Sequence, residues 1–237
     1  MNIETLLSKS INKFNQTIRI VLPFIILYTL IYRILSPSTF NELLISNIEN
    51  LEQVNFNLQS NDIIFMVLSF VLSMFYNLLI IKFIFISLKN NKKTFRLDEI
   101  FSLFILLLSI YILSIVPSML ITLLIPFLGV LLVPIIYIAL FFSIYIMLEF
   151  HTSVLDSLVK SYVLFKNNIS NMLVLCLIHC AGALMIIYAT TLLGVPFSYI
   201  AGNFTMIFQQ IFMNIGHYLL SIIWICFYLS LDRSCIK

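Results

Sequence analysis

Six long apolar runs constrain this chain more than any other feature of its sequence. Each run supplies about the 20 apolar residues that an α-helix needs to cross the hydrocarbon core of a bilayer. Backbone groups inside lipid must be satisfied within the segment, so helices are the plausible structure for such long runs without alternation. The predicted spans are residues 18–36, 63–88, 100–125, 129–149, 172–193 and 204–231.

Composition agrees with a membrane protein. Of 237 residues, 62% are hydrophobic and 10% are charged, and the mean hydropathy is +1.10. A soluble domain is typically about 45–50% apolar and about 25% charged. We therefore expect an all-α polytopic protein with a single membrane domain over residues 1–237 and no cleavable signal peptide. Membrane lipids are the expected partners, with no nucleic acid and no cofactor.

The distribution of basic residues predicts orientation. Twelve of the 13 lysines and arginines fall in the N-terminal segment, near residues 82–96, in the segment after the fourth span or in the C-terminal tail, and only Arg33 falls on the other side. The positive-inside rule then places both termini in the cytoplasm. The loop over residues 37–62 is expected outside, with a short helix that begins at a Thr39–Glu42 capping box. Lys82 is expected to reach the cytoplasmic interface by snorkelling.

The third and fourth spans are separated only by PFLG, residues 126–129, which predicts a tight hairpin at this turn. After the fourth span, the less apolar residues 151–170 predict an amphipathic helix on the cytoplasmic membrane surface. Residues 1–17 predict another such helix. The same short pattern occurs at Lys9 to Ile18 and at Lys160 to Ile169: a Lys-Ser pair, a Phe four residues after the Ser, and a closing Ile. Each copy precedes a predicted membrane hairpin, which suggests that one hairpin module occurs twice.

A helical wheel of residues 151–170 separates an apolar arc from a polar arc. The apolar arc is predicted to sink into the membrane, whereas Ser157, Ser161 and Asp156 are predicted to face water, with Leu164 as the exception. The candidate interfacial residues are Leu158, Lys160, Tyr162, Phe165 and Lys166. Substitutions of Ser157 are therefore expected to be mild, and the two lysines are expected to meet anionic headgroups.

Several polar side chains fall at membrane depth, where they are candidate functional positions. They are Asn77, His179, Gln210, Asn214 and His217. One reading is a small-solute transporter or channel, and prolines in the third and fourth spans agree with interrupted helices. The other reading is that these groups hydrogen-bond between helices. A water-filled cavity that reaches them would favour the first reading.

The cluster CLIHC places Cys176, His179 and Cys180 on one face of the fifth span, and sulfur with imidazole suits zinc or copper. The nearest further ligand is His217. At 1.5 Å per residue, His179 lies roughly 11 Å and His217 roughly 21 Å from the cytoplasmic ends, which argues against a shared metal. We expect His179 to lie level with Trp224 and no metal to be bound.

The chemistry of a hydrolase is also missing from the spans. No Asp or Glu lies well inside a span, no serine lies in a Gly-x-Ser-x-Gly turn, and the buried histidines have no acidic partner in the sequence pattern. We therefore expect a protein that is not an enzyme and that has a structural or envelope-related role.

The order of these features resembles the YciC family of bacterial inner-membrane proteins. The features are an amphipathic N-terminus, an outward loop after the first span, a proline-punctuated hairpin and then SLVKSYVLFKNN. The most specific part is Ser157, Leu158, Ser161, Leu164 and Asn168, although Val159, Lys160, Val163 and Lys166 replace the arginines and tryptophan of the family's pattern. The resemblance implies a six-helix protein of the bacterial inner membrane and supplies no active site.

Overall fold

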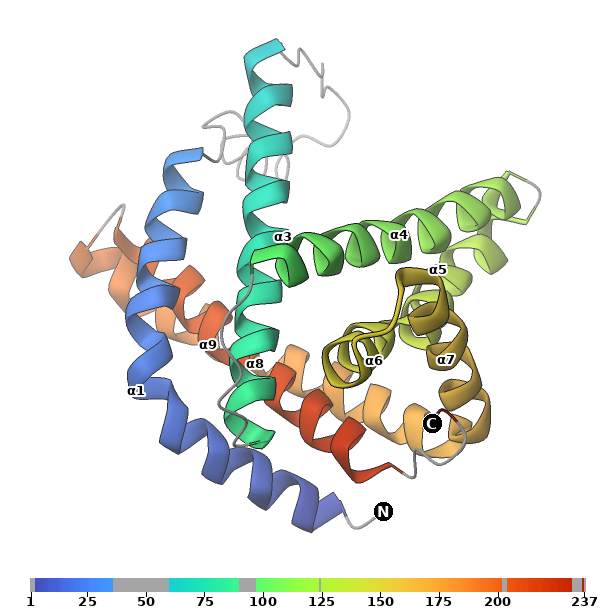
Figure 1. Ribbon diagram of the computed structural model, residues 1–237. Helices are drawn as coiled ribbons and strands as arrows, with labels where there is room; N and C mark the ends of the chain where they lie inside the picture. Colours follow the sequence, from blue (N-terminus) through green and yellow to red (C-terminus); the bar gives the residue numbers. More distant parts are fainter. Residues whose placement is uncertain are drawn as a thin grey trace. The chain divides into compact units, whose positions relative to one another are not determined.

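The structure is a computed structural model that describes residues 3–35, 60–89, 97–123, 125–201, 204–231 and 236. These residues form α-helices and no strand (Figure 1). The helices are α1 Ile3–Leu35, α3 Ser60–Lys89, α4 Leu97–Thr122, α5 Pro126–Phe141, α6 Ser143–Phe150, α7 Val154–Asn167, α8 Ile169–Ala201 and α9 Phe204–Ser230.

Within these residues, six helical segments are long and apolar enough to cross a membrane. They are Ile3–Ile34, Ile63–Lys89, Glu99–Thr122, Leu132–Phe150, Ile169–Leu192 and Thr205–Ser230. The predicted all-α, six-span fold class is therefore confirmed. The predicted outward helix at Thr39 and Glu42 lies outside the described residues.

The predicted amphipathic segment 1–17 and the first span 18–36 form one continuous helix, α1, without a break at their boundary. Its 33 residues are more than the about 20 that cross a hydrocarbon core. No glycine lies in this stretch, and Pro23 is its one proline.

The chain divides into two compact units, each described here by itself. The first unit comprises Met1–Gln16, Leu78–Met185 and Gly216–Lys237, and the second comprises Thr17–Asn77 and Ile186–Ile215. The second unit holds a stacked pair, Tyr28 on α1 and Tyr76 on α3, whose ring centroids are 3.7 Å apart. Asn214 on α9 donates to the Thr29 hydroxyl of α1 at 2.9 Å, so polar as well as aromatic contacts join helices of this unit.

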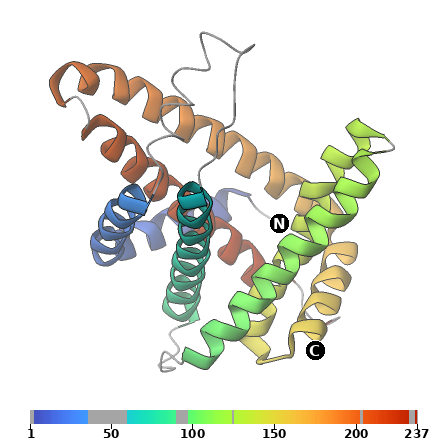
Figure 2. The same cartoon turned by 90° about the horizontal axis from the view of Figure 1, so that it is seen from above.

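In the first unit, α4 and α5 form an antiparallel hairpin, seen side by side in Figures 1 and 2. The predicted hairpin is present, but its turn is not PFLG. The chain reverses before Pro126, which is already the first residue of α5. Proline suits this position because its fixed φ fits a helix and its missing N–H would lack a helical partner there. It also holds Ile125 in an extended conformation.

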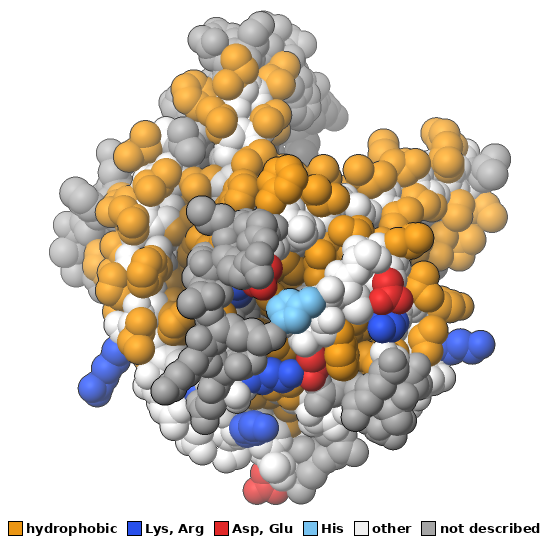
Figure 3. All heavy atoms as spheres, viewed as in Figure 1, with side chains coloured by type: hydrophobic (Ala, Val, Ile, Leu, Met, Phe, Trp, Pro, Cys, Tyr) orange, Lys and Arg blue, Asp and Glu red, His pale blue; other side chains and the backbone are white. Residues whose placement is uncertain are grey.

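The predicted fourth span is two helices, α5 and α6, separated at Phe142. The residues that follow, Ser143 to Ile146, are buried. Phe142 and Tyr145 lie among aromatic rings of α9, with ring centroids 5.7 Å from Phe142 to Trp224 and 5.3 Å from Tyr145 to Tyr228. The break thus lies inside the aromatic core of the first unit. The outer parts of the α4–α5 hairpin carry apolar side chains (Figure 3), as a lipid-facing surface requires.

Candidate functional site

A buried lysine joins α3 to α4 in the first unit. Lys82 is only 2% exposed, and its Nζ lies 2.8 Å from Oε2 of Glu99, in the first turn of α4. The Lys82 ammonium is therefore paired inside the protein, and its snorkelling to the interface stays a prediction. Pairing with this carboxylate offsets part of the cost of burying the ammonium.

The other oxygen of Glu99, Oε1, lies 3.7 Å from Nδ1 of His151. His151 caps the C-terminus of α6 in a left-handed conformation with φ 53°, and its backbone N–H donates to the Met147 carbonyl at 3.0 Å. Histidine is among the residues that adopt this region more readily than most. The pair borders a cleft of about 180 Å³ that is lined by Glu99, Ser102, Leu103, Met147, Leu148, His151 and Thr152.

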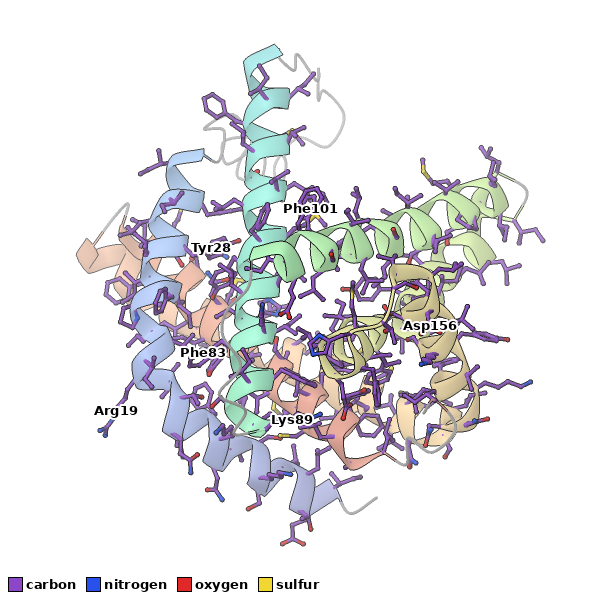
Figure 4. The ribbon with its side chains drawn as sticks, viewed as in Figure 1. Arg19, Tyr28, Phe83, Lys89, Phe101 and Asp156 are labelled. Atoms are coloured by element: carbon purple, nitrogen blue, oxygen red, sulfur yellow. The ribbon has the colours of Figure 1, made fainter. Side chains whose placement is uncertain are left out.

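A second charged pair links α3 to α6 and α9. Lys89, at the C-terminal end of α3 (Figure 4), lies 2.6 Å from Oε1 of Glu149. Tyr228 donates its hydroxyl to Oε2 of the same carboxylate at 2.7 Å. Lys13 on α1 donates to the Ser87 carbonyl at 2.9 Å. Sequence reasoning missed both charged pairs. The available signal in the sequence was that acidic residues lie at ends of α4 and α6 and basic residues lie toward the end of α3.

α7 begins with a cap and lies on α5. The Ser153 side chain accepts from the backbone N–H of Asp156 at 3.3 Å, which satisfies one free donor of the first turn. Ser161 is fully buried and donates to the Ala139 carbonyl of α5 at 2.8 Å. Ser157 is also fully buried, and its hydroxyl lies 2.6 Å from that of Thr152. The prediction that these serines face water is therefore wrong.

The apolar arc predicted for α7 is divided by this packing. Leu158 is buried and Phe165 half-buried, whereas Leu155, Val159 and Tyr162 are 73%, 56% and 55% exposed. Leu164, the exception on the helical wheel, is fully buried beside the serines. The membrane-facing candidates among the predicted residues are thus Tyr162 and its exposed neighbours, and Leu158 contributes to the protein core.

The two lysines of α7 have different surroundings. Nζ of Lys160 lies 3.3 Å from Oδ2 of Asp156, a residue labelled on α7 in Figure 4, and 5.9 Å from the centroid of the Phe150 ring. Lys166 is exposed. Among the described residues, Lys166 makes no ion pair and no side-chain hydrogen bond.

Within the CLIHC cluster, His179 contacts α9. Nε1 of Trp224 donates to Nδ1 of His179 at 2.9 Å, which confirms that these residues lie level with each other. Cys176 is half-buried and Cys180 is exposed. Over the described ranges, His, Cys, Asp and Glu form no group of three that could hold a metal ion. The donor set present around His179 therefore gives no basis for a metal centre, and the absence of a bound metal stays a prediction.

The remaining polar candidates are not gathered into one site. Asn77 and His217 are exposed. In the second unit, the side-chain amide of Gln210 donates to Asn214 at 3.4 Å, and Asn214 donates to Thr29. The cleft beside Glu99 and His151, here called the α4–α6 cleft, includes none of the five predicted intramembrane positions. Asn214 and His179 are used in hydrogen bonds between helices, as the packing interpretation predicts.

Comparison with family models, curated proteins and solved structures found no match to this chain. The resemblance to the YciC family stays a prediction. Two features of the first unit are candidate functional features: the exposed surface of α7 and the paired charges around Glu99.

Proposed function

We propose that this protein is a non-enzymatic, structural component of the bacterial inner membrane with both termini in the cytoplasm. In this proposal, α7 and the N-terminal part of α1 lie in the cytoplasmic interface and fix the directions in which neighbouring spans leave it. The biased distribution of basic residues supports the orientation. The resemblance of residues 157–168 to the YciC family agrees with the proposed location.

The observation that carries the proposal is the three-sided surface of α7. One side, with Ser161 and Leu164, packs on the protein. A second side exposes Leu155, Val159 and Tyr162, and a third carries Asp156 and Lys160. A helix with a protein side, an apolar side and a charged side suits the boundary between a bundle, the acyl chains and water.

The N-terminal part of α1 matches α7 around its Lys-Ser pair, although Glu4 and Ser8 stand where α7 has Leu155 and Val159. Ser10 aligns with Ser161, and both are fully buried. The next residues, Ile11 and Tyr162, are 50% and 55% exposed. The preceding residues are Lys9 and Lys160. The shared burial at these aligned positions supports a similar packing of the two segments on the protein.

Cysteine labelling in sealed vesicles tests the placement. Single cysteines would be introduced at positions 155, 159 and 162 and at positions 156, 160 and 167, in a variant without the native cysteines. We expect a water-soluble maleimide to react at least tenfold more slowly with the first set, because acyl chains exclude water. Equal rates for the two sets in membranes would refute the interfacial placement. Labelling in detergent with a small apolar maleimide serves as the control for protein packing.

A small-solute transporter is the second candidate, and one observation favours it. Charged groups inside candidate spans are expensive and often mark a pathway, and Lys82 is buried beside Glu99 and the α4–α6 cleft. Removal of the pair distinguishes the candidates. A Lys82→Met/Glu99→Leu variant of normal abundance should complement a deletion strain if the pair is structural. It should fail to complement, while remaining abundant, if the pair carries solute or protons.

A further inference from the structure

Lys166 interrupts an exposed apolar stripe. Leu155, Val159, Tyr162 and Lys166 recur at spacings of four and three residues, which keep one side of α7 in line, and Ile169 follows at the start of α8. Leu155, Val159, Tyr162 and Ile169 are all exposed. Leu173, one turn further along α8, is also exposed. The stripe on α7 thus leads toward an exposed apolar side of a candidate span.

An exposed ammonium group in such a stripe is positioned to meet an anionic headgroup at the membrane surface. Lys160 has Asp156 and the Phe150 ring, and it lies on another side of α7. Lys166 makes no ion pair with another described residue. Its nearest polar neighbour along the stripe is Tyr162, one turn earlier and exposed. Acyl chains that pack beneath Leu155 and Val159 would place lipid headgroups beside α7, where the long side chains of Lys166 and Tyr162 can reach them.

We propose that Lys166 and the Tyr162 hydroxyl bind the phosphate of an anionic phospholipid in the leaflet that α7 contacts. The ammonium and hydroxyl donate to phosphate oxygens, and the flanking apolar residues contact the acyl chains. This inference rests on the proposed interfacial placement and adds its ligand class. It also separates the two lysines that sequence reasoning treated alike: Lys166 binds lipid, and Lys160 serves the protein surface.

The test uses the full-length protein purified in detergent and incubated with phosphatidylglycerol or phosphatidylcholine, with bound lipid counted by native mass spectrometry. We expect the wild type to prefer phosphatidylglycerol and Lys166→Gln to lower that affinity about fivefold, since one basic residue contributes on the order of 1 kcal/mol. Lys160→Gln, the matched control, should change it less than twofold. Tyr162→Phe should weaken the binding of phosphatidylglycerol. Lys166→Arg, which keeps the positive charge, should bind it about as well as the wild type.

Equal losses in Lys166→Gln and Lys160→Gln, or equal binding of the two lipids by the wild type, would overturn the site. Displacement of phosphatidylglycerol by millimolar inorganic phosphate would also overturn it, because the site would then take free phosphate. Monodisperse elution in size-exclusion chromatography confirms that each variant is folded. If Lys166→Gln is not folded, Lys166→Arg is compared with the wild type instead. Protection of positions 155, 159 and 162 from maleimide, together with lipid binding that Lys166→Gln leaves unchanged, refutes this site and leaves the interfacial placement standing.

Discussion

Removing one member of the Lys82–Glu99 pair should destabilise the protein far more than removing both. The ammonium of Lys82 is 2% exposed, and the Glu99 side chain is 28% exposed. Breaking a buried pair by removing one partner typically costs about 3–5 kcal/mol, because the other charge stays buried without compensation. Glu99 borders the α4–α6 cleft and lies near His151, so water can relieve part of its charge. We therefore expect Lys82→Met to cost about 3 kcal/mol, roughly a 100-fold change in the folded-to-unfolded ratio.

Removing Glu99 from the pair should cost more than removing Lys82. Glu99→Leu leaves an ammonium that is nearly sealed from water, so we expect a loss toward 5 kcal/mol, with low abundance in the membrane. The double variant Lys82→Met/Glu99→Leu replaces the pair by apolar groups of similar length and should recover most of the stability. Lys166→Met is the control for an exposed lysine.

Unfolding in mixed detergent micelles, followed by circular dichroism, measures these differences, and membrane abundance gives an independent readout. The expected order of stability is wild type, double variant, Lys82→Met and then Glu99→Leu. If Lys82→Met lost less than 1 kcal/mol, or the double variant were as unstable as the single variants, the reasoning from a buried ion pair would be refuted.

Three further predictions concern helix packing. In a double-mutant cycle of Trp224→Phe and His179→Phe, we expect a coupling free energy of about 1 kcal/mol from the bond between the two side chains, measured by micelle unfolding, whereas additive effects would contradict it. Ser161→Leu should cost about 1–3 kcal/mol in the same assay, because a larger side chain does not fit against α5, and Ser170→Leu at an exposed position should be nearly neutral; equal effects would contradict the α7 packing. Cys176→Ala/Cys180→Ala should leave zinc and copper at the background of the wild type in plasma mass spectrometry, and stoichiometric metal lost in the double variant would contradict the packing role of CLIHC.

The number and type of the long helices followed from sequence because apolar length is a strong and local signal. Breaks between helices were harder. The proline of PFLG was correctly associated with the α4–α5 hairpin, but it begins α5 instead of forming the turn. Neither glycine nor proline marks the break between α5 and α6 at Phe142. Its position among rings of α9 depends on contacts between segments far apart in sequence.

Side-chain roles at the candidate site depended on rotation and packing, which a helical wheel does not contain. The wheel grouped Ser161 with polar residues because it cannot distinguish a hydroxyl in water from one bonded to the Ala139 carbonyl. Leu164 lies on the arc that the wheel assigns to polar residues. This apolar residue was the one indication in the sequence that this side of α7 is buried. Lys82 and Glu99 are 17 positions apart on different helices, so their pairing needs the relative rotation of α3 and α4.

Topology is the most direct test of the account, since the proposed function requires α7 and both termini on the cytoplasmic side. Paired alkaline-phosphatase and green-fluorescent-protein fusions after Lys93, after Asn168 and after Lys237, with one inside the 37–62 loop, measure the side of each position. We expect fluorescence without phosphatase activity at the first three positions, and phosphatase activity without fluorescence in the loop. Phosphatase activity from the fusions after Lys93 or Asn168 would contradict the account.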